Sequence, residues 1–337
     1  MLFGVSVAKM SGRGLGFTGG TIDKLESIPG YNTNISMKEF QKNVNEIGIS
    51  IIAQTLDVAP ADKKLYALRD TISCVESIPL IASSIMSKKI ASGANKLVLD
   101  VTVGSGAFMK DIESATELAK KMVVIGKNAG IDTVAILTNM DEPLGYAIGN
   151  SLEIVEVIDF LRCNMPKDLE EVILELGAYM IKFAGISDDL GKNKEMMLEK
   201  IKNGEAFQKL IELVENQGGD ISYIYDSGKL LKAKYIEEIK LNIDGYICKM
   251  DASKIGQIAC DLGAGRITKD DEINNNVGIV LKYKVGEKVN KDTILGYIHA
   301  DDLEKLNKAK EDIKEVIHIS SDIKDVVKKE HILGIIE

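Results

Sequence analysis

A glycine-dense stretch, residues 10–21, stands between a short apolar run and a segment with helical spacing. The apolar run covers Leu2 to Lys9, and the helical spacing resumes over Ile22 to Ile28. An apolar run, a glycine loop and a helix in this order are typical of the place where an α/β sheet begins a ligand site. The sequence therefore predicts that the chain opens with a strand, a loop and a helix of an α/β fold.

Further short apolar runs predict additional strands. They cover residues 47–54, 96–101 and 134–137, and a helix is expected over residues 112–129. Strands that alternate with helices indicate an α/β domain with a mainly parallel sheet.

The spacing of apolar residues changes twice along the chain. Residues 63–90 carry helical spacing, with Pro79 suited to the first turn of a helix, and residues 152–213 are strongly helical. From Ala233 onward, short alternating segments indicate a separate α+β domain, for example over residues 243–250 and 278–284. We therefore expect a central α/β domain over 1–61 and 96–232, part of a small all-α lobe over 62–95, and a C-terminal α+β domain over 233–337.

Composition and charge restrict the class of protein. Hydrophobic residues make up 45% of the chain and charged residues 28%, which is typical of globular proteins and excludes disordered and fibrous classes. No apolar run reaches the roughly eighteen residues of a membrane span. Residues 1–8 show neither a basic leader nor a cleavage site, so the expected location is cytoplasmic.

The charge distribution indicates what kind of ligand the chain binds. A net charge of -9 argues against a nucleic-acid partner, whose phosphates would be repelled. Residues 1–100 nevertheless hold eleven Lys or Arg against nine Asp or Glu, so this part is near +2. A small anionic ligand therefore fits best in the first third of the chain. The four cysteines lack metal-site spacing and are expected to be free thiols.

The loop over residues 9–21 offers backbone amides, hydroxyls and two cations just before a helix N-terminus. Proteins hold anions at such places, so a phosphate or sugar phosphate fits this chemistry. Two alternatives stay open. Gly14, Gly16 and Gly19 also satisfy a dinucleotide-binding spacing, although residues 31–40 offer no strand to complete that motif. The glycines could also serve only a tightly packed turn.

A second cluster combines a serine and a lysine with an arginine further upstream. Ser84 and Lys88 are four residues apart, so in a helix they lie on the same face and can approach one ligand together. A solvated charged face is the alternative interpretation of these lysines.

Five segments stand in an order that matches a known family: residues 9–21, 61–89, 99–109, 142–150 and 261–266. From about Val5 to Ile336 the chain resembles the nucleoside phosphorylases that include thymidine phosphorylase and the broader pyrimidine nucleoside phosphorylases. The resemblance implies a cytoplasmic homodimer of pyrimidine salvage, in which an α lobe holds the base and an α/β domain holds phosphate. The implied reaction converts uridine, thymidine or deoxyuridine and inorganic phosphate into free base and pentose 1-phosphate, without an organic cofactor.

The resemblance also implies roles for individual residues. Lys9, Ser11 and Thr21 match phosphate-binding positions. Three further residues match the pyrimidine-binding set, namely Arg69, Ser84 and Lys88. The two cations of that set are expected to be catalytic, because negative charge grows on the leaving base in the transition state.

A monovalent cation is implied as well. The carbonyl groups of Leu144 and Ala147 and the carboxylate of Glu156 match the family's cation site, whose oxygen ligands suit potassium.

The chain departs from the family pattern in three ways. The family's Lys-His-Ser-x-Gly-Gly-Val-Gly-Asp phosphate loop, with its catalytic histidine, is expected upstream of Met1, so we expect weak turnover by this chain alone. Phe17 stands where many members have histidine, and Thr102 where they usually have lysine. An inactive or regulatory pyrimidine-binding remnant and a related phosphoribosyltransferase are therefore the competing hypotheses.

Overall fold

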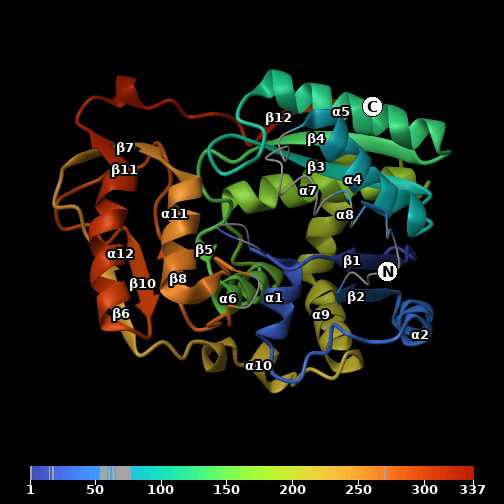
Figure 1. The fold of residues 1–337 in the computed structure, drawn as a ribbon, viewed down its shortest axis with the longest axis horizontal. Helices are drawn as coiled ribbons and strands as arrows, with labels where there is room; N and C mark the ends of the chain where they lie inside the picture. The colour runs from blue at the N-terminus through green and yellow to red at the C-terminus, as the bar shows by residue number, and fades with distance from the viewer. Residues whose placement is uncertain are drawn as a thin grey trace. The chain divides into compact units, whose positions relative to one another are not determined.

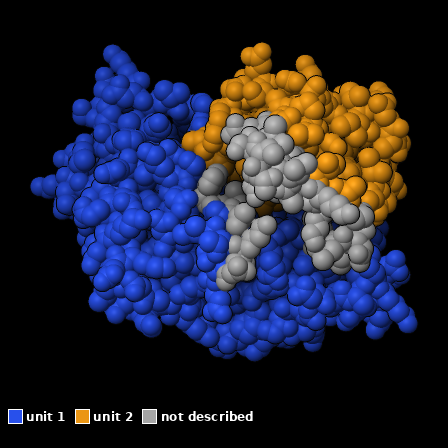
Figure 2. Space-filling view, in the orientation of Figure 1, with its two compact units in different colours: residues 1–53, 141–167, 199–329 blue, residues 54–140, 168–198, 330–337 orange. Residues whose placement is uncertain are grey.

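The computed structural model of the chain describes residues 2–14, 16, 19–53, 59, 61–62, 65, 77–268 and 271–337. The chain divides into two compact units, which Figure 2 shows in blue and orange. Unit 1 comprises residues 1–53, 141–167 and 199–329, and unit 2 comprises residues 54–140, 168–198 and 330–337. The division into three domains expected from the sequence stays a prediction.

Unit 2 contains a three-stranded sheet (Figure 1). Strand β3 (Lys96–Val103) pairs in parallel with β4 (Asp132–Asn139), and helix α5 (Ile112–Asn128) connects them. These elements confirm the strands and the helix expected from the sequence. Strand β12 (Ile332–Ile336) adds to the other edge of β4 in antiparallel orientation, which the sequence pattern did not indicate.

Two helix layers cover the two faces of this sheet. Successive residues of a strand point to opposite faces. Leu99 and Leu137 accordingly pack with α4 (Ile78–Ala91) and α5, whereas Ile136 packs with α7 (Lys167–Phe183). Pro79 lies in the first turn of α4, as its sequence position predicted. Helix α8 (Leu190–Lys202) also contributes apolar contacts on the α7 side.

The first part of unit 1 is built on two parallel strands, β1 (Val7–Ser11) and β2 (Ile49–Ala53). Between them the chain forms α1 (Thr21–Glu26) and α2 (Met37–Ile47), and the Ser36 hydroxyl caps α2. Helices α6 (Asn150–Leu161) and α9 (Glu205–Asn216) complete this core, which includes Ile28, Ile158 and Val214. The expected opening of strand, loop and helix is confirmed.

A buried glutamine replaces a neighbouring strand along β2. The Gln217 Oε1 accepts a hydrogen bond from the Ile51 N–H at 3.0 Å, and its Nε2 donates to the Ile51 carbonyl at 2.9 Å. The same Nε2 donates to the Asn32 carbonyl at 3.0 Å. Because a primary amide has one acceptor and two donors, it can satisfy both backbone groups of a strand residue at once.

The second part of unit 1 is antiparallel. One sheet has the order β5 (Ala147–Ile148), β8 (Gly278–Leu281), β10 (Gly296–Ala300) and β6 (Tyr235–Ile239). The other has the order β11 (Ile317–Ser320), β7 (Gly245–Met250) and β9 (Lys288–Val289). Helices α11 (Ala252–Ala259) and α12 (Leu303–Val316) share one apolar core with both sheets, as the α+β texture predicted. Helix α10 (Ser222–Tyr225) precedes this part.

Within the described ranges, no helix is both long enough and apolar enough to cross a membrane. Cys163, Cys248 and Cys260 are free thiols, and Cys74 lies outside the described residues.

Candidate functional site

The three predicted phosphate-side residues lie on the first strand and the first helix of unit 1. Lys9 and Ser11 belong to the carboxyl-terminal half of β1, and Thr21 is the first residue of α1. Although the Lys9 side chain is exposed overall, the pKa of its ammonium is lowered, first by desolvation and then by the Lys24 ammonium. An anion at this position would relieve the repulsion between the two ammonium groups.

A buried carboxylate stabilises the glycine loop through hydrogen bonds. Asp23 is only 3% exposed, and its Oδ1 accepts from the guanidinium groups of Arg13 at 3.1 Å and Arg266 at 2.8 Å. Its Oδ2 accepts from the Gly14 N–H at 2.7 Å. A buried charge is tolerated only when it is paired and hydrogen-bonded, and Asp23 meets both conditions.

This network corrects part of the sequence interpretation. Arg13 also donates to Glu26 at 2.7 Å, so its charge is neutralised inside the protein and is not a second cation for a ligand. The Gly16 N–H donates to the Arg266 carbonyl at 2.7 Å. Two loop amides that were expected to hold an anion, those of Gly14 and Gly16, therefore already have partners.

The tight-turn interpretation accounts for one glycine of the loop. A Cβ atom on Gly20 would lie 2.2 Å from the Gly14 nitrogen, so no larger residue fits there without a backbone shift. The dinucleotide alternative gains no support from the next segment, because the chain enters α2 after residues 31–36 without forming a strand. Leu15, Phe17 and Thr18 lie outside the described residues.

The predicted base-side pair is adjacent in unit 2. Ser84 is buried on α4, and the Lys88 Nζ lies 3.3 Å from its hydroxyl oxygen. The Lys88 Nζ also forms an ion pair with Asp62 at 3.1 Å, and the lysine side chain is 32% exposed. The expected proximity of the two side chains is confirmed, and a fully solvated charged face does not describe Lys88. Arg69 lies outside the described residues.

Thr102, the second departure from the family pattern, lies on β3 opposite Thr138 of β4.

Two of the three proposed cation ligands, Ala147 and Glu156, are in contact in unit 1. The Glu156 Oε1 on α6 accepts from the N–H groups of Tyr146 at 2.6 Å and Ala147 at 3.2 Å. Leu144 lies two residues before this contact, and Gly145 between them has a φ of +70°. Burial nevertheless raises the pKa of Glu156 to about 7, because the two amides and the nearby Lys284 compensate the desolvation only in part.

An ammonium from the C-terminal half of unit 1 holds the same loop. The Lys284 Nζ donates to the carbonyl groups of Pro143 and Gly145, and it lies 5.3 Å from the centre of the Tyr146 ring. Beside it, the Val285 N–H donates to the Glu142 carboxylate at 2.9 Å. The sequence analysis missed Lys284, because nothing in its spacing relates it to a loop 139 residues away.

The donor set fits a monovalent cation. Glu156 is a desolvated carboxylate with a raised pKa, which is the condition that an added positive charge relieves. Carbonyl and carboxylate oxygens are the ligands that alkali cations prefer. The described part of the chain contains no cluster of three or more His, Cys, Asp or Glu side chains suited to a metal ion, so a site here would depend on backbone carbonyl groups.

Comparison with known proteins identifies two matching domains. Residues 2–207 match the glycosyl transferase family a/b domain, and residues 246–320 match the pyrimidine nucleoside phosphorylase C-terminal domain. The class is therefore that of enzymes that transfer a glycosyl group.

Individual relatives identify the family within this class of enzymes. The chain is 53% identical over 298 residues to a pyrimidine-nucleoside phosphorylase of Staphylococcus epidermidis, covering 88% of this chain and 69% of the relative. It is 49% identical over 318 residues to the enzyme of that name from Geobacillus stearothermophilus, covering 94% and 73%. For the Bacillus subtilis enzyme the identity is 50% over 313 residues, covering 93% and 70%. The chain belongs to the pyrimidine nucleoside phosphorylase family.

Proposed function

We propose that this chain catalyses the phosphorolysis of pyrimidine nucleosides such as uridine, thymidine and deoxyuridine. Inorganic phosphate attacks the anomeric carbon of the sugar, the bond to the base breaks, and the products are the free base and a pentose 1-phosphate. No organic cofactor takes part. Family membership supports this reaction. Among the geometric observations, the adjacency of Ser84 and Lys88 on α4 supports it most directly.

On the phosphate side, we assign the anion to Lys9, Ser11 and Thr21. The internal pairing of Arg13 supports this choice, because it leaves Lys9 as the cation of the loop that has no carboxylate partner among the described residues. The Thr21 position at the start of α1 adds a hydroxyl, and Ser11 adds another at the end of β1. Hydroxyl donors and an ammonium are the groups that proteins use for phosphate.

On the base side, we assign the pyrimidine to Arg69, Ser84 and Lys88. As the glycosidic bond breaks, negative charge develops on the base, and cations at its carbonyl oxygens stabilise that charge. The Lys88 ammonium is half-buried and pairs with Asp62 at 3.1 Å, so a base that gains negative charge would compete with that carboxylate for it. The Ser84 hydroxyl, which is buried, would orient the ring through a hydrogen bond.

We assign a potassium ion to Leu144, Ala147 and Glu156. When bound, the ion would supply positive charge beside the Glu156 carboxylate. The raised pKa of Glu156 supports this assignment. The chain's own part is to present the oxygen ligands, and Gly145 allows the close approach, since a Cβ there would lie 2.3 Å from the Glu156 Oε2.

The proposal is tested by the release of free uracil from uridine with and without inorganic phosphate. We expect release only with phosphate, and we expect Lys88→Met to lower kcat/KM by about 10²-fold, because it removes a preorganised cation. Lys89→Met, on the same helix, is the matched control and should change kcat/KM by less than about threefold.

Two outcomes would contradict the proposal. Phosphate-independent release of uracil would indicate a hydrolase. Absence of release, with uracil binding intact and dependent on Lys88, would favour a regulatory pyrimidine-binding protein.

The proposal also includes a homodimer and a cytoplasmic location, which the resemblance to the family supports. Sedimentation equilibrium should give twice the chain mass of 36.7 kDa. A concentration-independent monomer would contradict the dimer.

A further inference from the structure

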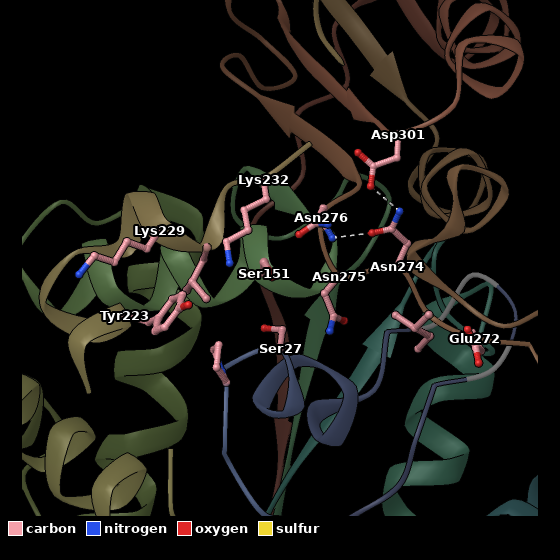
Figure 3. A pocket seen from close by; sticks show the side chains of 13 residues that line it. Ser27, Ser151, Tyr223, Lys229, Lys232, Glu272, Asn274, Asn275, Asn276 and Asp301 are labelled. Atoms are coloured by element: carbon pink, nitrogen blue, oxygen red, sulfur yellow. Dashed lines mark hydrogen bonds between the residues drawn. The ribbon is translucent and has the colours of Figure 1, made fainter. Parts of the chain in front are cut away.

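Unit 1 contains a pocket of about 550 Å³ whose walls come from the turn after α1, from α6, from α10 and the segment after it, and from the loop before β8 (Figure 3). A pocket of this volume is large enough to bind a small molecule. Of the described residues proposed above for phosphate, base or cation, none lines it. The pocket is thus a candidate for a separate ligand.

Two buried serines form its floor. Ser151 is 2% exposed and lines the pocket, so its hydroxyl is within reach of a ligand there. Ser27 is 8% exposed, and its hydroxyl donates to the Lys24 carbonyl at 2.6 Å. Because its proton is used in this way, the Ser27 oxygen can only accept a further hydrogen bond. The floor therefore offers one donor or acceptor and one acceptor.

A lysine supplies positive charge above this floor. Figure 3 shows the Lys232 ammonium directed toward Ser151, with Glu272 at the far side of the pocket. Lys232 forms no ion pair within the described part of the chain, and its Nζ lies 5.3 Å from the centre of the Tyr223 ring. This contact with an aromatic face keeps the ammonium beside the pocket without neutralising it.

One acidic residue of the wall, Asp301, already has hydrogen-bond partners. One Asp301 oxygen accepts from the Asn274 side chain at 2.8 Å, and the other accepts from the Lys234 N–H at 2.8 Å. The Asn275 side chain points down into the pocket beside Ser27 (Figure 3). The lining therefore presents the Lys232 ammonium, the two serine hydroxyls and the Asn275 amide to a ligand, with Lys229, Glu272 and Tyr223 also in the wall.

We propose that this pocket binds a small phosphorylated sugar. Its phosphate is held by the Lys232 ammonium and the Ser151 hydroxyl, which are the groups that favour an oxyanion. Its sugar hydroxyls donate to the Ser27 oxygen and exchange hydrogen bonds with the Asn275 amide. A free phosphate would use only the first pair, and an unphosphorylated sugar only the second. This site is additional to the phosphorylase site and does not depend on it.

Isothermal titration calorimetry with ribose 5-phosphate tests the proposal. We expect Lys232→Met to weaken binding about tenfold or more, and Ser151→Ala about threefold to tenfold. Lys240→Met is the matched control, because that exposed lysine pairs with Glu238 and does not line the pocket. Inorganic phosphate and ribose, titrated separately, should each bind at least tenfold more weakly than the phosphorylated sugar.

The variants Lys9→Met and Lys88→Met distinguish this pocket from the phosphorylase site. Binding of ribose 5-phosphate that survives both substitutions but falls with Lys232→Met supports the proposal, whether or not the chain has phosphorylase activity. Binding that is lost with Lys9→Met and unchanged by Lys232→Met would overturn it. Equal binding of phosphate and ribose 5-phosphate would show an anion site only and would also overturn it. Thermal unfolding of each variant verifies that it is folded.

Discussion

Two carboxylates inside unit 1, Asp23 and Glu156, differ in how completely the protein compensates their charge. Asp23 accepts from two guanidinium groups and one backbone amide at 2.7 to 3.1 Å. Glu156 accepts from two backbone amides, and burial still raises its pKa to about 7. The fold pairs the first carboxylate with two guanidinium groups, whereas it compensates the second only in part, even with the Lys284 ammonium nearby.

The two carboxylates therefore have different roles within one unit, one in stabilising the structure and one in binding a ligand. A buried charge that has all its partners stabilises the chain around it. Removal of one partner leaves a buried charge without full compensation, which costs free energy. An under-compensated charge is a place where a ligand of opposite sign gains free energy. We therefore interpret Asp23 as the brace of the glycine loop and Glu156 as part of a cation site.

The largest effect is expected at the brace. Asp23→Asn should lower the free energy of unfolding by about 3 kcal/mol, because Arg13 and Arg266 then lose the charge between them. Urea denaturation measures this change. Asp226→Asn is the control: Asp226 and Lys229 are exposed and 3.9 Å apart, so we expect less than about 0.5 kcal/mol. Equal losses in the two variants would show that Asp23 does not brace the loop.

A smaller effect is expected at the ammonium beside Glu156. Lys284→Met removes the hydrogen bonds to the Pro143 and Gly145 carbonyl groups and should lower the free energy of unfolding by about 2 kcal/mol. Lys282→Met, two residues earlier, removes exposed contacts to the Tyr297 hydroxyl at 3.1 Å and to the Tyr297 ring, and should change the free energy of unfolding by less than about 0.5 kcal/mol. If urea denaturation ranks the two in reverse, the role assigned to Lys284 is wrong.

The cation interpretation of Glu156 predicts a salt-specific effect. Potassium chloride should stabilise the protein by about 1 kcal/mol more than tetramethylammonium chloride at equal ionic strength, because a ligand that binds only the native state stabilises it. Glu156→Gln should abolish this difference, whereas Glu153→Gln, on the same helix, should retain it. A thermal unfolding series in the two salts provides the measurement. A potassium effect that persists in Glu156→Gln would remove Glu156 from the site.

The smallest effect concerns a buried base without a counter-charge. His299 on β10 is 6% exposed, its Nδ1 has no hydrogen-bond partner in the described ranges, and desolvation lowers its pKa. The unfolded chain therefore takes up the proton first as the pH falls below about 6.5, and stability decreases in that direction. His299→Gln should flatten the profile of unfolding free energy between pH 7 and pH 5. Exposed His318→Gln should leave the slope unchanged.

The spacing of residues in the sequence by itself determined which neighbouring residues form one element and which lie on the same face of it. The order of apolar run, glycine loop and helical spacing predicted β1, the loop and α1, because strands and helices repeat with different periods. Four-residue spacing predicted that Ser84 and Lys88 would be adjacent, and the 3.3 Å separation agrees. The family resemblance implied that Ala147 and Glu156 belong to one site, and the fold places them in contact. The roles of all these residues stay predictions.

Tertiary packing alone decided which charges are left for a ligand. Arg266 reaches Asp23 from 243 residues away, and Lys284 reaches Gly145 from 139 residues away. The Gln217 amide completes the edge of β2 from a distance of 166 residues. No sequence period connects such positions, because their separation depends on how whole elements pack and not on the repeat of any one element. Arg13 is a cation in the sequence, and only the folded chain shows that its charge is already paired.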